Sequence, residues 1–139
     1  MGNEEVQEAA GITDKRQSKL IHEEITREII GAAMEVHRTP GVGFLEKVYE
    51  NALVLEFRAR GIAAESQTPV SVHYKGRVVG EYFADVVVAG GVILELKVAD
   101  TLTKAHEAQM LNYLRATGLR VGLVLNFGAP RLDWKRLVA

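Results

Sequence analysis

The chain has 139 residues, of which 47% are hydrophobic and 25% are charged, a composition typical of a single globular domain that can bury a core. It contains no cysteine, which excludes disulfides and thiolate metal sites, and no uncharged apolar stretch approaches the roughly 18 residues of a membrane span. The net charge of −1 argues against a general nucleic-acid binder, so any contact with phosphate would have to be local and partly mediated by metal.

The N-terminal part of the chain predicts a tail and two helices. Residues 1–15 are polar and aperiodic and predict a flexible tail, which leaves 16–139 as one domain. The tail also lacks the basic and apolar segments of a signal peptide, so we expect a cytoplasmic protein. Apolar residues at helical spacing predict one helix that starts at Leu20 and ends before Thr39-Pro40, and a second over about 45–60.

The remainder of the chain alternates β-branched runs with turn residues. It predicts, in order, an extended segment over 63–74, strands over 77–88 and 92–98, a helix over 101–116, a strand over 120–127 and a short basic tail. A helix between the third strand and the last implies that these two strands pair in parallel. The expected fold is therefore an α/β domain, a mixed β-sheet flanked by α-helices.

Three charged residues interrupt the apolar strands at the centre of this sheet. They are Asp85, Glu95 and Lys97, and a buried sheet tolerates such charges only when they are paired or bind an ion. Since side chains alternate along a strand, Glu95 and Lys97 project to the same face.

The length of the turn between the two strands decides whether Asp85 joins that face. A two-residue loop at Gly90-Gly91 pairs Asp85 with Leu96 and places the aspartate on the opposite face. A three-residue loop, which starts at Ala89, pairs Asp85 with Glu95 instead. With the second register, two carboxylates and a lysine share a face and form a site for a divalent cation.

Two predicted helices carry further polar groups at helical spacing. Glu46 and Tyr49 share one face of the second helix, and Gln109 and Tyr113 share one face of the third.

These motifs together resemble a known family. Gly43-x-x-Glu46-x-x-Tyr49 is similar to the signature of the GxxExxY protein family, a branch of the PD-(D/E)XK nuclease superfamily. The resemblance runs from about Ile25 to Val138 and includes Tyr82-Phe-Ala-Asp85, Glu95-Leu-Lys97, His106-Glu-Ala-Gln109, Asn112-Tyr113-Leu114 and Asn126-Phe127-Gly128. One departure is that Ala84 precedes Asp85, where the superfamily's name has proline.

The resemblance implies a restriction-endonuclease-like fold and a metal-dependent nuclease. It implies that Asp85 and Glu95 bind Mg²⁺ or Mn²⁺, that Lys97 orients or activates the attacking water, and that Glu46 completes the metal shell. Gln109-x-x-x-Tyr113 is similar to a helix motif that supports the active site and DNA in the exonuclease-like branch. Nucleic acid, with DNA favoured, is the expected partner, and a homodimer remains open.

Simpler interpretations accompany each of these assignments. Asp85 could pair with Lys97 without any metal, and Glu46 could be an acid placed at a helix N-terminus by the macrodipole. Glu95 and Lys97 could also be the polar face of an exposed edge strand.

The remaining groups are open in the same way. Tyr49 and Tyr113 are as readily core residues as site residues, and His106 is more often a surface residue than a phosphate contact. The basic tail, with Arg131, Lys135 and Arg136, is solvated or contacts phosphate. The whole chain could keep the nuclease fold as a catalytically silent binding or interaction module.

Overall fold

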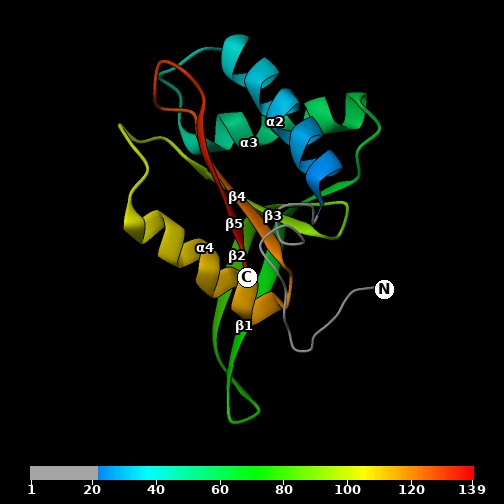
Figure 1. Ribbon diagram of the computed structural model, residues 1–139, viewed down its shortest axis with the longest axis vertical. Helices are drawn as coiled ribbons and strands as arrows, with labels where there is room; N and C mark the ends of the chain where they lie inside the picture. The colour runs from blue at the N-terminus through cyan, green and yellow to red at the C-terminus, as the bar shows by residue number, and fades with distance from the viewer. Residues whose placement is uncertain (1–21) are drawn as a thin grey trace.

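The computed structural model describes residues 22–139, and the predicted flexible tail at 1–15 lies outside this range. The elements (Figure 1) are α2 (Glu23–Arg38), α3 (Glu46–Ala59), β1 (Ala64–Tyr74), β2 (Arg77–Val88), β3 (Val92–Lys97), α4 (Lys104–Thr117), β4 (Val121–Asn126) and β5 (Asp133–Val138). Among these helices none is long and apolar enough to cross a membrane.

The strands form one sheet in the order β1-β2-β3-β4-β5. β3 and β4 pair in parallel across the α4 crossover, and every other neighbouring pair is antiparallel. The predicted α/β class, with a mixed sheet flanked by helices, is therefore confirmed. β3 occupies the centre of the sheet, so Glu95 and Lys97 do not lie on an exposed edge strand.

Side chains of β3 divide between two hydrophobic cores. Leu94 and Leu96 belong to the core that α2 and α3 cover, whereas Ile93 packs with residues of α4 on the other face. Because side chains alternate along a strand, Glu95 and Lys97 share the face of Ile93 and project toward α4. Figure 1 shows α2 and α3 grouped together, apart from α4.

The basic C-terminal segment is a strand, so the prediction of a tail was wrong. β5 pairs antiparallel with β4, from Asn126 opposite Asp133 to Val121 opposite Val138. The segment lies at the sheet edge, and none of its residues is fully buried. Lys135 and Arg136 are adjacent charged residues, so the sequence lacks the alternation of apolar and polar residues that predicts a strand. At the opposite edge, β1 continues through Pro69, because an edge strand tolerates a missing N–H donor.

Helix α4 begins three residues later than the spacing of apolar residues indicates. Thr103 caps it, because the threonine hydroxyl accepts a hydrogen bond from the His106 N–H at 3.4 Å. The His106 Nδ1 in turn accepts from the Thr103 N–H at 3.1 Å, which completes a reciprocal cap.

Asn126 ties the end of β3 to β4 through a buried amide. Its Oδ1 accepts hydrogen bonds from the Ala99 N–H at 3.0 Å and the Gly128 N–H at 2.9 Å, and its Nδ2 donates to the Ala99 carbonyl at 2.9 Å. The side chain is 0% exposed. The segment that follows Lys97 is therefore fixed by one side chain as well as by the strand ladder.

We predict that Asn126→Ala lowers the free energy of unfolding by about 3 kcal/mol, because it removes three hydrogen bonds and leaves the half-buried backbone groups of Ala99 and Gly128 without this partner. The matched control is Asn112→Ala, since Asn112 is exposed and accepts one hydrogen bond from Arg115. This control should change stability by no more than about 0.5 kcal/mol. Urea denaturation measures both, and equal losses would contradict the role assigned to Asn126.

Candidate metal centre

The turn between β2 and β3 contains three residues, the longer of the two predicted loops. Val88 pairs with Val92 and Val86 pairs with Leu94, which leaves Ala89, Gly90 and Gly91 as the loop. Ala89 and Gly90 both adopt positive φ angles, of 53° and 67°. The ladder ends at Val86, and Asp85, the next residue, meets Glu95 through side-chain hydrogen bonds instead.

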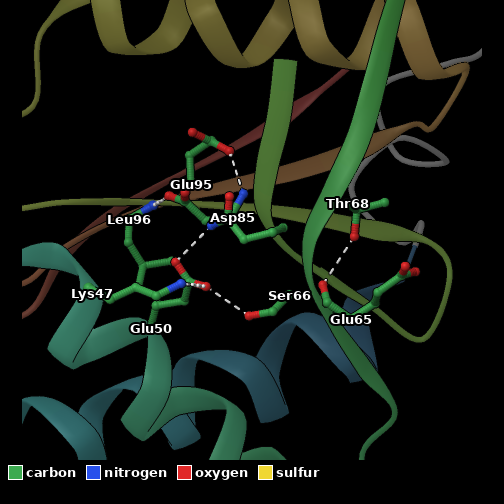
Figure 2. Close-up of polar contacts among 9 residues, drawn as sticks. Lys47, Glu50, Glu65, Ser66, Thr68, Asp85, Glu95 and Leu96 are labelled. Carbon is green, nitrogen blue, oxygen red and sulfur yellow. Dashed lines mark hydrogen bonds and ion pairs between the residues drawn. The ribbon is translucent and has the colours of Figure 1, made fainter. Parts of the chain in front are cut away.

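At this position side chains replace the backbone ladder. The Asp85 N–H donates to Glu95 Oε2 at 3.0 Å, and the Leu96 N–H donates to Asp85 Oδ2 at 2.8 Å. Figure 2 shows the Glu95 carboxylate above the strand, on the side of the helix at the top of the view, with a dashed line to the Asp85 N–H. Each carboxylate thus satisfies a backbone donor of the other residue or its neighbour, and this exchange holds the two acids together.

Burial raises the pKa values of both acids of this pair. Glu95 is 5% exposed, and burial, followed by the charge of Asp85, raises its pKa from 4.5 to about 8. Burial also raises the pKa of Asp85 above its ordinary value. The positive charge of Lys97 lowers both pKa values but does not offset these effects. Two acids that resist ionisation together can ionise when a cation binds between them.

Lys97 lies on the same face and is held from α4. Its Nζ donates to Gln109 Oε1 at 2.9 Å. None of the ion pairs within residues 22–139 joins Lys97 to Asp85 or Glu95, so the simple salt bridge between Asp85 and Lys97 is not what the structure shows. The lysine therefore stands beside the carboxylates with its ammonium oriented by an amide.

Glu46 approaches the pair without joining it. It is the first residue of α3 and is exposed, yet its charge contributes to the raised pKa values of both Asp85 and Glu95. In the part of the chain that the structure describes, no three His, Cys, Asp or Glu side chains are grouped closely enough to hold a metal. The role of Glu46 as a metal ligand stays a prediction.

Glu50 is a polar residue of this region that sequence reasoning missed. It is 4% exposed and accepts hydrogen bonds from Ser66 Oγ at 2.8 Å, Gln67 Nε2 at 3.0 Å and Lys47 Nζ at 3.1 Å. Figure 2 shows Glu50 on α3, on the opposite side of Asp85 from Glu95. Its position one turn after Glu46, within an otherwise apolar face, is the signal that could have identified it.

The environment of Glu50 keeps that acid charged. Burial alone would raise its pKa, but the hydrogen bonds from Ser66, Lys47 and Gln67 outweigh burial and lower the pKa below the ordinary value. The resulting fixed negative charge is one of the causes that raise the pKa of Asp85.

The two predicted tyrosines and the histidine have different surroundings. Tyr49 is fully buried, with its ring stacked on Phe127 at 4.7 Å and its hydroxyl donating to the Gly41 carbonyl at 2.6 Å. Tyr113 packs with Ile93 in the core under α4, and burial, followed by the charge of Glu95, raises its pKa. Tyr49 therefore contacts the core, and His106 caps α4 as described above, whereas Tyr113 joins Gln109 beside the carboxylates.

The donor set fits a hard divalent cation. Mg²⁺ prefers oxygen ligands and is commonly held by one or two carboxylates, with water and substrate oxygens completing the shell. Asp85 and Glu95 supply two carboxylates, and the chain has no cysteine that would favour a softer metal. Mg²⁺ and Mn²⁺ are the ions that suit this chemistry.

Comparisons with known proteins agree with the fold. The sequence profile of the PD-(D/E)XK nuclease superfamily matches residues 23–137. The solved structure titled "Crystal structure of SSO0001" is similar over 93% of this chain and 70% of that chain, with a TM-score of 0.56 and 13% sequence identity. At that identity the likeness shows the fold alone. No curated protein matches the sequence. Neither match reaches the narrower GxxExxY family, which stays a prediction.

The raised pKa of Glu95 predicts a pH dependence of stability in the absence of metal. Between the unfolded value of 4.5 and the folded value of about 8, the folded state holds a proton that the unfolded state has lost. Stability therefore falls as pH rises through this window, by at most about 1.4 kcal/mol per pH unit for one proton.

Glu95→Gln has no such proton and serves as the reference. Chemical denaturation in EDTA, repeated from pH 5 to pH 8, should show the wild type losing stability relative to Glu95→Gln as pH rises. Parallel pH profiles for the two proteins would contradict the assignment.

Proposed function

The chain belongs to the PD-(D/E)XK nuclease superfamily, and we propose that it is a metal-dependent nuclease that hydrolyses phosphodiester bonds of nucleic acid, with DNA as the favoured substrate. The observation that carries the proposal is the register of β2 and β3. It brings Asp85 and Glu95 together on the central strands, with Lys97 on the same face as Glu95.

In this proposal Asp85 and Glu95 would hold Mg²⁺ or Mn²⁺. The bound ion supplies a more acidic water and neutralises charge on the leaving oxygen. Burial raises the pKa of Glu95, so Glu95 would have to lose a proton to hold the ion, and ion binding would be coupled to proton release.

Lys97 orients the attacking water or stabilises negative charge that develops at the phosphate. The hydrogen bond from its Nζ to Gln109 restricts the position of the ammonium, which makes Gln109 a positioning residue. Since no ion pair within residues 22–139 links Lys97 to either acid, its charge is free to act on substrate.

A second function is supported by the charge of the protein. A net charge of −1 offers little general attraction for nucleic acid, which favours a catalytically silent nuclease-fold binding or interaction module. The two functions differ in one respect that can be measured, since only the nuclease requires cation binding and cleavage to depend on the same residues.

We predict that Lys97→Ala retains cation binding but loses cleavage by about 10²-fold or more, because the lysine acts on the reacting groups rather than on the metal. Asp85→Asn should lose both. Lys104→Ala removes the same charge from the exposed start of α4 and is the matched control.

Calorimetry with Mg²⁺ and Mn²⁺ measures binding, and a cleavage screen with Mn²⁺ over single-stranded, duplex and branched substrates measures activity. If Lys97→Ala cleaves as fast as wild type, the lysine has no catalytic role. If the wild type binds neither cation, the nuclease proposal fails, and the second function, a catalytically silent binding or interaction module, remains.

Glu46 is proposed as the third acid of the metal shell, reached directly or through a water. We predict that Glu46→Gln weakens Mg²⁺ binding about tenfold, within the range usual for residues that support a metal site. Glu23→Gln is the matched control, because Glu23 occupies the equivalent first position of α2. Equal and negligible effects of the two substitutions on calorimetric affinity would make Glu46 only a helix-end acid.

A further inference from the structure

A groove of about 820 Å³ lies between α4 and the β1–β2 hairpin. Residues of β1, β2 and α4 form its walls, and α4 packs against β1 along the same face of the sheet that carries Glu95 and Lys97. A cleft of this size accommodates a small organic group or one to two nucleotides, since ligand sites commonly measure roughly 300–1,000 Å³.

The groove is connected to the candidate metal centre through Gln109, although Asp85, Glu95 and Lys97 do not line it. Gln109 and Tyr113 both line the groove, and Gln109 also accepts the hydrogen bond from Lys97. Tyr113 is close enough to Glu95 and Asp85 for their charges to raise its pKa, after the larger effect of burial. A chain that occupied the groove would therefore pass beside Gln109, the hydrogen-bond partner of Lys97.

The groove contains an aromatic ring that is open to solvent. Tyr82 is 52% exposed, and its ring centroid lies 6.0 Å from that of Tyr113 at an interplanar angle of 44°. The ring of Tyr113 contacts the ring of Tyr82, and the exposed part of the Tyr82 ring can stack on a planar group of a ligand. Nucleobases stack on such rings whatever their sequence, because every base has a π-face.

Polar groups on α4 and β1 complete the lining. Arg115 and Asn112 lie on the groove side of α4, where Arg115 Nη1 donates to Asn112 Oδ1 at 2.9 Å, and His73 faces them from β1. The guanidinium keeps further N–H donors for a phosphate oxygen, and the amide can bond a base edge or sugar.

We propose that this groove binds unpaired nucleotides of a single-stranded nucleic acid, with one base stacked on Tyr82 and a phosphate beside Arg115. The inference rests on the proposed nuclease function for the nature of the ligand, and it names the strand type that the enzyme takes. Among the groove residues that the structure describes, only Arg115 carries a permanent positive charge. Duplex binding depends on many phosphate contacts, whereas stacking holds a single strand with few.

The test is fluorescence anisotropy with labelled single strands of about ten nucleotides, made as DNA and as RNA. It is run in Ca²⁺ and in EDTA, so that binding is separated from cleavage. Tyr82→Ala should weaken binding by about tenfold, the loss expected for one base stack, and Tyr82→Phe should retain it.

The neighbouring Phe83 provides a matched control. Phe83 is 53% exposed but does not line the groove, so Phe83→Ala removes a similar ring from outside it and should leave binding unchanged. Arg115→Gln tests the phosphate contact separately and should reduce the slope of log affinity against log salt by about 0.7.

Several outcomes would overturn the proposal. These are no saturable binding of single strands under either condition, tighter binding of duplex than of single strands, and equal losses for Tyr82→Ala and Phe83→Ala. Failure of the nuclease function gives a different result. Single strands would then bind in a Tyr82-dependent manner without Mn²⁺-dependent cleavage, which leaves the groove assignment standing.

Discussion

The register of one β-hairpin is the constraint on which the candidate centre depends. A three-residue turn that starts at Ala89 pairs Val86 with Leu94, and Asp85 follows directly at the end of this ladder, within hydrogen-bond reach of Glu95. Ala89 accepts a left-handed φ of 53° in this turn, a conformation that costs a residue with a Cβ about 1 kcal/mol. The two carboxylates then take over hydrogen bonds that the strands would otherwise make between backbones.

Two buried acids on either side of Asp85 are held in opposite protonation states. Burial keeps Glu95 protonated near neutral pH, whereas three side-chain donors keep Glu50 ionised. The charge of Glu50 reaches Asp85 and raises its pKa, so the metal-free site accumulates negative potential that its own lysine does not neutralise. Lys97 instead bonds to Gln109, and α4 thereby links the orientation of the lysine to the groove that Tyr113 and Tyr82 line.

Much of this arrangement follows from local sequence rules. Strand boundaries at Arg77 and Val88 are set by β-branched runs between turns, and they were predictable for that reason. The choice between the two loop lengths could not be predicted, because Gly90 and Gly91 permit both turns. The sequence could single out Glu50 as an acid inside an apolar helical face but not explain it, because two of its three donors lie on β1, 16 and 17 residues away. β5 was missed because the charged residues Asp133, Lys135 and Arg136 interrupt the apolar alternation of this edge strand.

The central claim is that Asp85 and Glu95 share one divalent cation, and paramagnetic broadening of amide NMR signals by Mn²⁺ tests it most directly. A bound ion broadens the nearest amides first. The amides of Asp85 and Leu96 donate to the two carboxylates, so their signals should disappear at the lowest Mn²⁺ concentrations, and excess Mg²⁺ should restore them. Broadening that begins at other acidic residues, or none at saturating Mn²⁺, would contradict a shared site.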